Sequence, residues 1–259
     1  MKEFLKLKEK LKKREITLGT WITLGNGSIA EILSRCSFDW LVIDLEHSVI
    51  SLSEAQQMIR VISLSGKVPL VRLSDQSSTL IKRVMDAGAA GVIVPNVKTA
   101  EEAKAVVAGV QYPPKGTRGV GLARAQGYGF NFEEYKTWAD KGSIVIVQIE
   151  HVLGVKNLRE ILAVPGIDGI LIGPYDLSGS IGLPGDLKNP KVEELVREAV
   201  VIAEEKKISA GIHVVSPDLE EVKLRIQQGF NFIGYSLDTI ILGKTFQEHL
   251  QIIREQIKS

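Results

Sequence analysis

The sequence predicts an α/β protein, a single-domain (β/α)8 TIM barrel that is preceded by an N-terminal helix. Short apolar runs along the chain are continuous rather than alternating, which is typical of parallel strands covered on both faces. Segments with helical periodicity separate these runs. No linker rich in Pro, Gly or Ser divides the 259 residues, so we predict one domain over residues 1–259. An open doubly wound sheet is the structural alternative, because alternation along a chain does not prove closure.

The first fifteen residues alternate Phe4, Leu5, Leu7 and Leu11 with seven Lys or Arg residues. This pattern lacks the apolar stretch of a signal peptide and predicts an N-terminal helix over residues 1–15 that covers the bottom of the fold. Membrane binding is the alternative, which three interspersed glutamates oppose. No run reaches the roughly 18 consecutive apolar residues of a spanning helix, so we predict a cytoplasmic protein with no membrane partner.

The apolar runs predict eight strands, and segments with helical periodicity lie between them. We predict strands at Thr17–Thr23, Trp40–Asp44, Val68–Arg72, Gly91–Pro95, Ser143–Glu150, Asp168–Gly173, Ser209–His213 and Phe230–Ser236. Helical periodicity predicts helices at Ser53–Ser65, Ser77–Ala87, Ala100–Val110, Asn157–Ala163, Lys191–Lys207, Asp218–Gln228 and Lys244–Lys258.

Two connections are long, Gln111–Gly142 and Leu177–Pro190, and connections of this length are commonly functional. The first contains Gly116–Gly121, which has no P-loop lysine and so does not predict binding of nucleoside triphosphates. We interpret this segment as a rim loop in which Arg124 faces an anionic substrate.

The charge and cysteine content exclude several classes of protein. The 32 Lys and Arg residues balance 31 Asp and Glu residues, so the composition predicts no nucleic-acid partner. The only cysteine, Cys36, excludes an intrachain disulfide and lies in an apolar pattern that predicts a packed helical thiol.

Carboxylates follow three predicted strands: Asp44 after the second, Glu150 after the fifth and Asp176 after the sixth. In a parallel barrel these strand ends meet at one rim, where metal sites and acid/base groups are assembled. Glu150 and Asp176 have no basic residue beside them and suit Mg²⁺ or Mn²⁺ better than zinc. On local sequence, two ordinary rim acids are an equally good interpretation.

Asp44 and His47 lie close enough in the chain for the carboxylate to orient the imidazole. A local capping role for both residues is equally consistent with the sequence. Arg72 ends the third strand, where a cation stabilises a carboxylate or enolate, and the alternative is a surface ion pair with Asp75 or Asp86.

The other histidines carry weaker signals. Strand alternation turns His151 away from the metal side and predicts a packing role. His213 ends the seventh strand, and the sequence is equally consistent with a position in the pocket and with a structural role for this residue. His249 lies in the last helix and is predicted to be solvated.

On these residues the chain resembles the HpcH/HpaI aldolase/citrate lyase family, and in particular its 4-hydroxy-2-oxoheptanedioate and 2-dehydro-3-deoxyglucarate aldolases. The similarity runs from about Gly19 to Leu242. The segments that carry it are Phe38–Trp40, Ile43–His47, Tyr112–Gly121, Val147–Glu150 and Gly173–Ser178.

The resemblance implies a class II aldolase that uses a divalent metal ion, Mg²⁺, Mn²⁺ or Co²⁺, to cleave a 4-hydroxy-2-oxo acid reversibly into pyruvate and an aldehyde. It implies metal ligands at Glu150 and Asp176, and Glu46 is left without a role. The remaining implied roles are an acid/base dyad at His47 with Asp44, pyruvate binding and enolate stabilisation at Arg72, and substrate binding at Gln148, Tyr175 and Asp176.

The resemblance also implies a homo-oligomer, commonly a hexamer built as a trimer of dimers, in which copies exchange their last helix. Tyr175 stands where many members carry a small or amide residue, and the segment Gly121–Ala125 is shorter than in the heptanedioate aldolase. The identity of the aldehyde therefore stays open. A lyase acting on acyl-CoA and a non-catalytic barrel that binds 2-oxo acids are the alternative functions.

Overall fold

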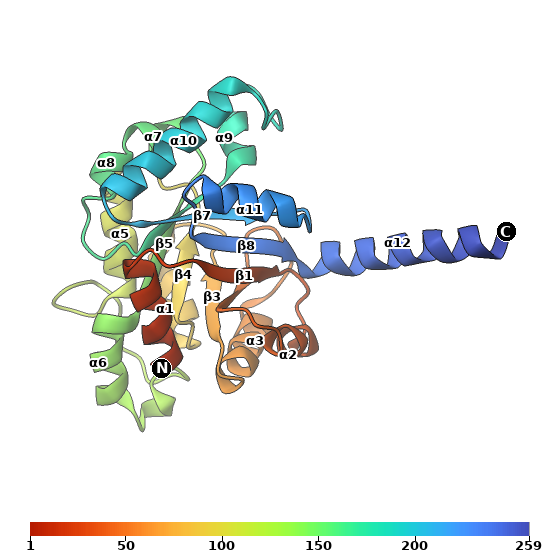
Figure 1. The fold of residues 1–259 in the computed structure, drawn as a ribbon. Coiled ribbons are helices and arrows are strands. Elements are labelled where there is room, and N and C mark those ends of the chain that lie inside the picture. Colours follow the sequence, from red (N-terminus) through yellow and green to blue (C-terminus); the bar gives the residue numbers. More distant parts are fainter. Residues whose placement is uncertain (259) are drawn as a thin grey trace.

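The strands close into a parallel barrel, which confirms the predicted (β/α)8 fold and excludes the open sheet (Figure 1). The computed structural model describes residues 1–258. The strands of this part of the chain follow the order β1 to β8, and β1 pairs with both β2 and β8. Their bounds are β1 Thr17–Ile22, β2 Trp40–Asp44, β3 Val68–Arg72, β4 Gly91–Val94, β5 Ile144–Ile149, β6 Gly169–Ile172, β7 Ser209–Val214 and β8 Phe232–Leu237.

Helices surround the barrel and cover the outward side chains of the strands. None of them, within residues 1–258, combines the length and apolar character needed to cross a membrane. The helices are α1 Lys2–Lys12, α2 Gly27–Ser34, α3 Leu52–Leu64, α4 Ser78–Asp86, α5 Ala100–Val110, the 3₁₀ turn η1 Gly127–Gly129, α6 Phe132–Gly142, α7 Val152–Lys156, α8 Leu158–Ile161, α9 Pro174–Ser180, α10 Pro190–Glu205, α11 Leu219–Gln227 and α12 Asp238–Lys258.

Helix α1 covers the end of the barrel at which the strands begin, as predicted. Its apolar face buries Phe4, Leu7 and Leu11 against the barrel interior. Lys8 donates to the carboxylate of Asp168 at 2.9 Å, just before β6 starts. Burial of three large apolar side chains on one face explains why this charged segment docks as a helix.

Aromatic side chains fill the barrel and form the floor below its open end. Trp40 stacks on Phe232 with ring centroids 4.1 Å apart, and Trp21 contacts Trp40 edge to face. Gly234 gives Trp21 its space, because a Cβ at that position would lie 2.3 Å from the indole ring. The rings are held tightly, and Trp21 lines the pocket above them.

Helix α12 begins at Asp238, six residues before the predicted start, and projects away from the barrel (Figure 1). The Asp238 carboxylate accepts hydrogen bonds from the backbone N–H groups of Thr23 and Leu24, both at 2.9 Å. These contacts tie the start of the helix to the end of β1. Beyond them the helix exposes large apolar side chains, namely Leu242, Phe246, Leu250, Ile252, Ile253 and Ile257.

The connection Gln111–Gly142 lies at the end of the barrel where strands begin, so its interpretation as a rim loop is wrong. Arg118 forms an ion pair of 2.6 Å with Asp86 at the end of α4, and Arg124 donates to the carbonyl of Ala87. The reason is topological, since this segment leads from α5 back to the start of β5. It also contains α6, which packs against α1.

The prediction of a packed thiol at Cys36 is also wrong, because Cys36 is exposed. Helix α2 ends at Ser34, so the apolar pattern that we interpreted as one helix does not continue to the cysteine.

Candidate active site

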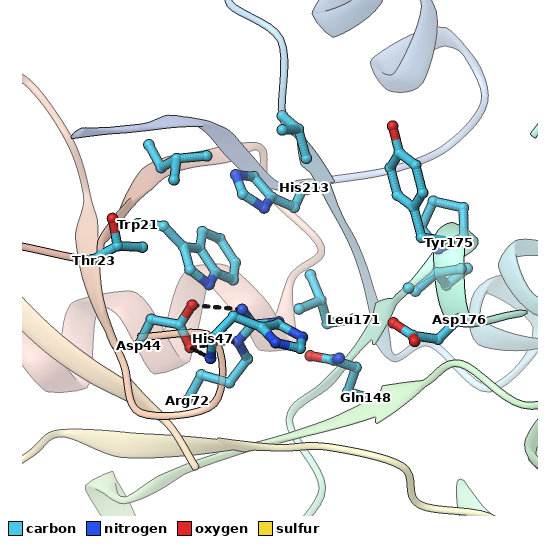
Figure 2. A pocket seen from close by; sticks show the side chains of 15 residues that line it. Trp21, Thr23, Asp44, His47, Arg72, Gln148, Leu171, Tyr175, Asp176 and His213 are labelled. Carbon is cyan, nitrogen blue, oxygen red and sulfur yellow. Dashed lines mark hydrogen bonds and ion pairs between the residues drawn. The ribbon is translucent and has the colours of Figure 1, made fainter. Parts of the chain in front are cut away.

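A pocket of about 320 Å³ opens at the end of the barrel where the strands finish (Figure 2). It is lined by residues from at least six strand ends, among them Trp21, Asp44, His47, Arg72, Gln148, Tyr175, Asp176 and His213. Strands of a closed parallel barrel all finish at this rim, which is why residues distant in the sequence meet here. A larger groove between α10 and α11 contains none of the predicted site residues.

Asp44 and Arg72 are partners in register on the neighbouring strands β2 and β3. Arg72 donates from Nε to Oδ1 at 3.0 Å and from Nη2 to Oδ2 at 2.6 Å. Oδ1 also accepts the backbone N–H groups of Glu46 at 3.0 Å and His47 at 3.3 Å. Asp44 therefore fixes both the guanidinium and the turn that carries His47.

The imidazole of His47 lies in the pocket, and its side chain is 65% exposed (Figure 2). Its Nε2 is 3.9 Å from Oε2 of Glu46. Asp44 makes a hydrogen bond to the backbone of His47, and its two carboxylate oxygens both accept from Arg72. The structure thus brings Asp44 and His47 together through the turn, while the carboxylate beside the ring is Glu46.

Glu150 directly follows β5 and is buried next to Gln148. Gln148 donates from Nε2 to Oε2 of Glu150. Burial raises the pKa of the Glu150 carboxyl to about 7, the hydrogen bond from Gln148 opposes this shift, and the negative charges of Glu46 and Asp176 add to it. Glu46, Glu150 and Asp176 are therefore close enough for their charges to repel one another, and of these three Asp176 lines the pocket.

This arrangement fits a hard divalent cation. The donors are carboxylate oxygens, and Oε1 of Gln148 is buried without a hydrogen-bond partner among the described residues. Within residues 1–258, no three His, Cys, Asp or Glu side chains are gathered closely enough to hold a metal ion by themselves. Mg²⁺ and Mn²⁺ are commonly bound by two carboxylates, and oxygen atoms of water and substrate complete the coordination.

Asp176 and Tyr175 lie in the first turn of α9, on the side of the pocket opposite Asp44 (Figure 2). Gly173 allows this turn to approach Glu150, because a Cβ there would lie 2.9 Å from Oε2 of that residue. Tyr175 is 57% exposed and stands at the mouth of the pocket.

His213 lines the pocket as a neutral side chain. Its ring stacks on Trp21 with centroids 4.3 Å apart, and Nε2 donates to the carbonyl of Ser236 at 2.9 Å. Burial lowers the pKa of His213 to about 4, so the imidazole stays uncharged near neutral pH. His151 has a structural role, because its Nδ1 accepts the N–H of Leu153 at the start of α7.

Sequence reasoning missed two residues of this site. Trp21 lies two residues before the predicted end of the first strand, and strand alternation places it on the inward face with Gly19 and Thr23. Glu46 was left without a role, although it directly precedes His47. Its contact with Arg72, 3.2 Å from Nη1 to Oε2, arises only when β2 and β3 pair.

The family model of the HpcH/HpaI aldolase/citrate lyase family matches residues 17–243. The 2-keto-3-deoxy-L-rhamnonate aldolase of Escherichia coli (strain K12) is 34% identical over 249 residues, which cover 95% of this chain and 92% of that protein.

Two solved structures share the fold over nearly their full lengths. An HpcH/HpaI aldolase/citrate lyase family protein from Burkholderia cenocepacia J2315 has a TM-score of 0.92 and 31% identity, with 96% of this chain and 99% of that chain covered. The HpcH/HpaI aldolase from Desulfitobacterium hafniense DCB-2 has a TM-score of 0.88 and 28% identity, with 96% of both chains covered.

Proposed function

Because the chain belongs to the HpcH/HpaI aldolase/citrate lyase family, whose aldolases are carbon-carbon lyases, we propose that it is a class II aldolase that depends on a divalent metal ion. In this proposal it cleaves a 4-hydroxy-2-oxo acid reversibly into pyruvate and an aldehyde. The observation that supports it best is the placement of Arg72, fixed by Asp44, in one pocket with His47 and Asp176.

The curated relative is named for a 2-keto-3-deoxy sugar acid, which supports a 2-oxo acid as the substrate class. Arg72 and Gln148 lie toward the floor of the pocket and would contact the 2-oxo acid. Tyr175 stands at its mouth and would contact the part of the substrate that leaves as the aldehyde.

Glu150 and Asp176 are the residues that would hold the metal ion. When bound, the cation would supply a Lewis acid for the keto oxygen of the substrate. The partly buried guanidinium of Arg72 is pre-oriented by two hydrogen bonds and stabilises negative charge that develops on the 2-oxo acid.

His47 is the proposed base. It removes the proton from the 4-hydroxyl, directly or through a water molecule, and the bond between carbons 3 and 4 breaks as the aldehyde carbonyl forms. The bonding electrons pass to the pyruvate fragment, which leaves as pyruvate after carbon 3 is protonated. Asp44 contributes by holding Arg72 and, through the backbone N–H of His47, the turn that carries the base.

We also propose that the protein is a homo-oligomer in which copies exchange α12, with a trimer of dimers as the assembly. Helix α12 projects from the barrel (Figure 1). Its large apolar side chains are exposed. A helix whose apolar face is exposed to water is not stabilised by packing. We therefore propose that a second copy of the chain covers this face of α12.

The test follows deuterium exchange into the methyl group of pyruvate by proton NMR, with Mg²⁺, Mn²⁺ or Co²⁺ in the reaction and a chelator in the control. We expect exchange that depends on the metal ion and is lost in Glu150→Ala. Glu101→Gln, which removes an exposed charge on α5, is the matched control and should exchange at the normal rate. An absence of deuterium exchange with all three metal ions would contradict the proposal. Turnover of acyl-CoA thioesters in place of 2-oxo acids would assign the protein to a different reaction.

A further inference from the structure

Glu46 lies between the two side chains to which the proposed reaction assigns charge stabilisation and proton transfer. Its Oε2 is 3.2 Å from Nη1 of Arg72 and 3.9 Å from Nε2 of His47. The side chain is only 18% exposed. No step of the proposed mechanism uses this carboxylate.

The oxygen that faces the ring still has the capacity to accept a hydrogen bond. Oε2 of Glu46 is buried and, among the described residues, has no partner in hydrogen-bond geometry. Leaving a buried acceptor without a hydrogen bond is unfavourable. Nε2 of His47 is 3.9 Å from this oxygen, and a small rotation of the largely exposed imidazole would bring it within hydrogen-bond distance.

Asp44 is less suited to orient the ring. Both of its oxygens accept hydrogen bonds from Arg72, and Oδ1 accepts two backbone N–H groups as well. Arg72 in turn has Nε and Nη2 directed at Asp44, which leaves Nη1 for Glu46. The contacts therefore divide the acids: Asp44 holds Arg72 by hydrogen bonds, and Glu46 lies within ion-pair distance of both Arg72 and His47.

We propose that Glu46 is a positioning residue that accepts a hydrogen bond from Nε2–H of His47. The bond holds the imidazole beside Arg72 and leaves Nδ1, with its free lone pair, to act as the base. This inference rests on the proposed function, since it assigns a partner to the base of that reaction. It concerns the orientation of His47 and requires no change in the metal ligands.

The first experiment observes the imidazole directly. Spectra of the full-length protein labelled with ¹⁵N-histidine are recorded with Mg²⁺ and pyruvate, and His47→Gln identifies the signal. We expect a proton resonance at Nε2 of His47 that is protected from exchange with water. It should weaken in Glu46→Gln, which keeps a neutral acceptor, and disappear in Glu46→Ala, while Glu101→Gln leaves it unchanged.

The second experiment separates the two half-reactions of the same variants. Because His47 serves cleavage rather than enolisation, Glu46→Ala should slow carbon-carbon bond cleavage by about 10- to 100-fold, part of the usual contribution of a general base. The rate of deuterium exchange into the pyruvate methyl group should change by less than about threefold. A change of this size is too small to reflect the loss of a charge-assisted hydrogen bond.

Two results would overturn this inference. One is a wild-type protein without a protected Nε2–H signal, which does not depend on turnover and so is distinct from a failure of the proposed function. The other is an equal loss of exchange and cleavage in Glu46→Ala with the His47 signal retained, which would assign Glu46 to Arg72 or to the metal ion.

Discussion

Arg72 donates two parallel hydrogen bonds to Asp44, 3.0 Å from Nε to Oδ1 and 2.6 Å from Nη2 to Oδ2. The residues are paired in register on adjacent strands, and their side chains are 12% and 2% exposed. The guanidinium is therefore pre-organised before any substrate arrives, and an anion that enters the pocket meets a cation whose orientation is already set.

Asp44→Asn should destabilise the fold as well as the site. It removes the buried carboxylate that accepts two hydrogen bonds from Arg72 and leaves Glu46 as an anionic contact of the guanidinium, and breaking a buried pair costs about 3 kcal/mol of the free energy of unfolding. Glu220→Gln breaks an exposed pair with Lys223 on α11 and should cost less than about 0.5 kcal/mol. Urea unfolding measures both values, and a loss below about 1 kcal/mol for Asp44→Asn would contradict the assignment.

The stability of the metal-free protein should fall between about pH 5 and pH 7. Burial raises the pKa of Glu150 from 4.5 to about 7, so in this window the folded state binds a proton that the unfolded state has lost. The stabilisation by the protonated Glu150 is fully present below the pKa of this group in the unfolded state. It is lost as the pH rises through the pKa in the folded state, and the loss amounts to about 3 kcal/mol of the free energy of unfolding.

Urea unfolding at a series of pH values, in a chelator, measures this slope. Glu150→Gln carries no titrating group at the site and should flatten the curve, and saturating Mg²⁺ should flatten it as well because the cation favours the ionised carboxylate. A wild-type curve no steeper than that of Glu150→Gln would show that Glu150 does not carry the proton.

Tyr175→Ala should change the aldehyde partner and spare the reaction of pyruvate. The phenol stands at the mouth of the pocket and is more than half exposed, whereas Arg72 and Gln148 lie deeper. Carbon-carbon bond formation between pyruvate and a series of hydroxyaldehydes of increasing length measures selectivity. We expect kcat/KM ratios among the aldehydes to shift by about tenfold, the scale of one pocket contact, with methyl exchange unchanged. Equal ratios in both proteins would remove Tyr175 from the substrate site.

Phe246→Asp should weaken the assembly. The side chain is 63% exposed on α12, and a buried aromatic anchor at an interface contributes about 2 kcal/mol or more, which corresponds to roughly 30-fold in the dissociation constant. Light scattering over a dilution series measures the change. Glu248→Gln, on the same helix, is the control and should assemble like the wild type. A wild-type protein that stays monomeric at every concentration would rule out the exchange of α12.

Local patterns were sufficient for the alternation of strands and helices and for the positions of the rim acids, whereas the pairing of β1 with β8 decided that the sheet closes. Burial on both faces requires continuous apolar runs, and a parallel barrel presents every strand end at one rim, so Asp44, Arg72 and Glu150 were predicted from their places at or just after strands. The N-terminal helix followed from Phe4, Leu7 and Leu11 in the same way, because one apolar face is a property of neighbouring residues.

The partners of these side chains were decided only by the tertiary structure. Hydrogen bonds between Asp44 and Arg72, the proximity of Glu46 to His47, and the place of Arg124 at the far end of the barrel depend on strand pairing and on the path of long connections. The projection of α12 depends on the contacts of Asp238 with the end of β1. The sequence by itself thus determined that Asp44, Arg72 and Asp176 stand at the rim, because strand ends are set by local periodicity. The structure decided which of them touch, because hydrogen bonds are short and directional and form only between side chains that folding brings together.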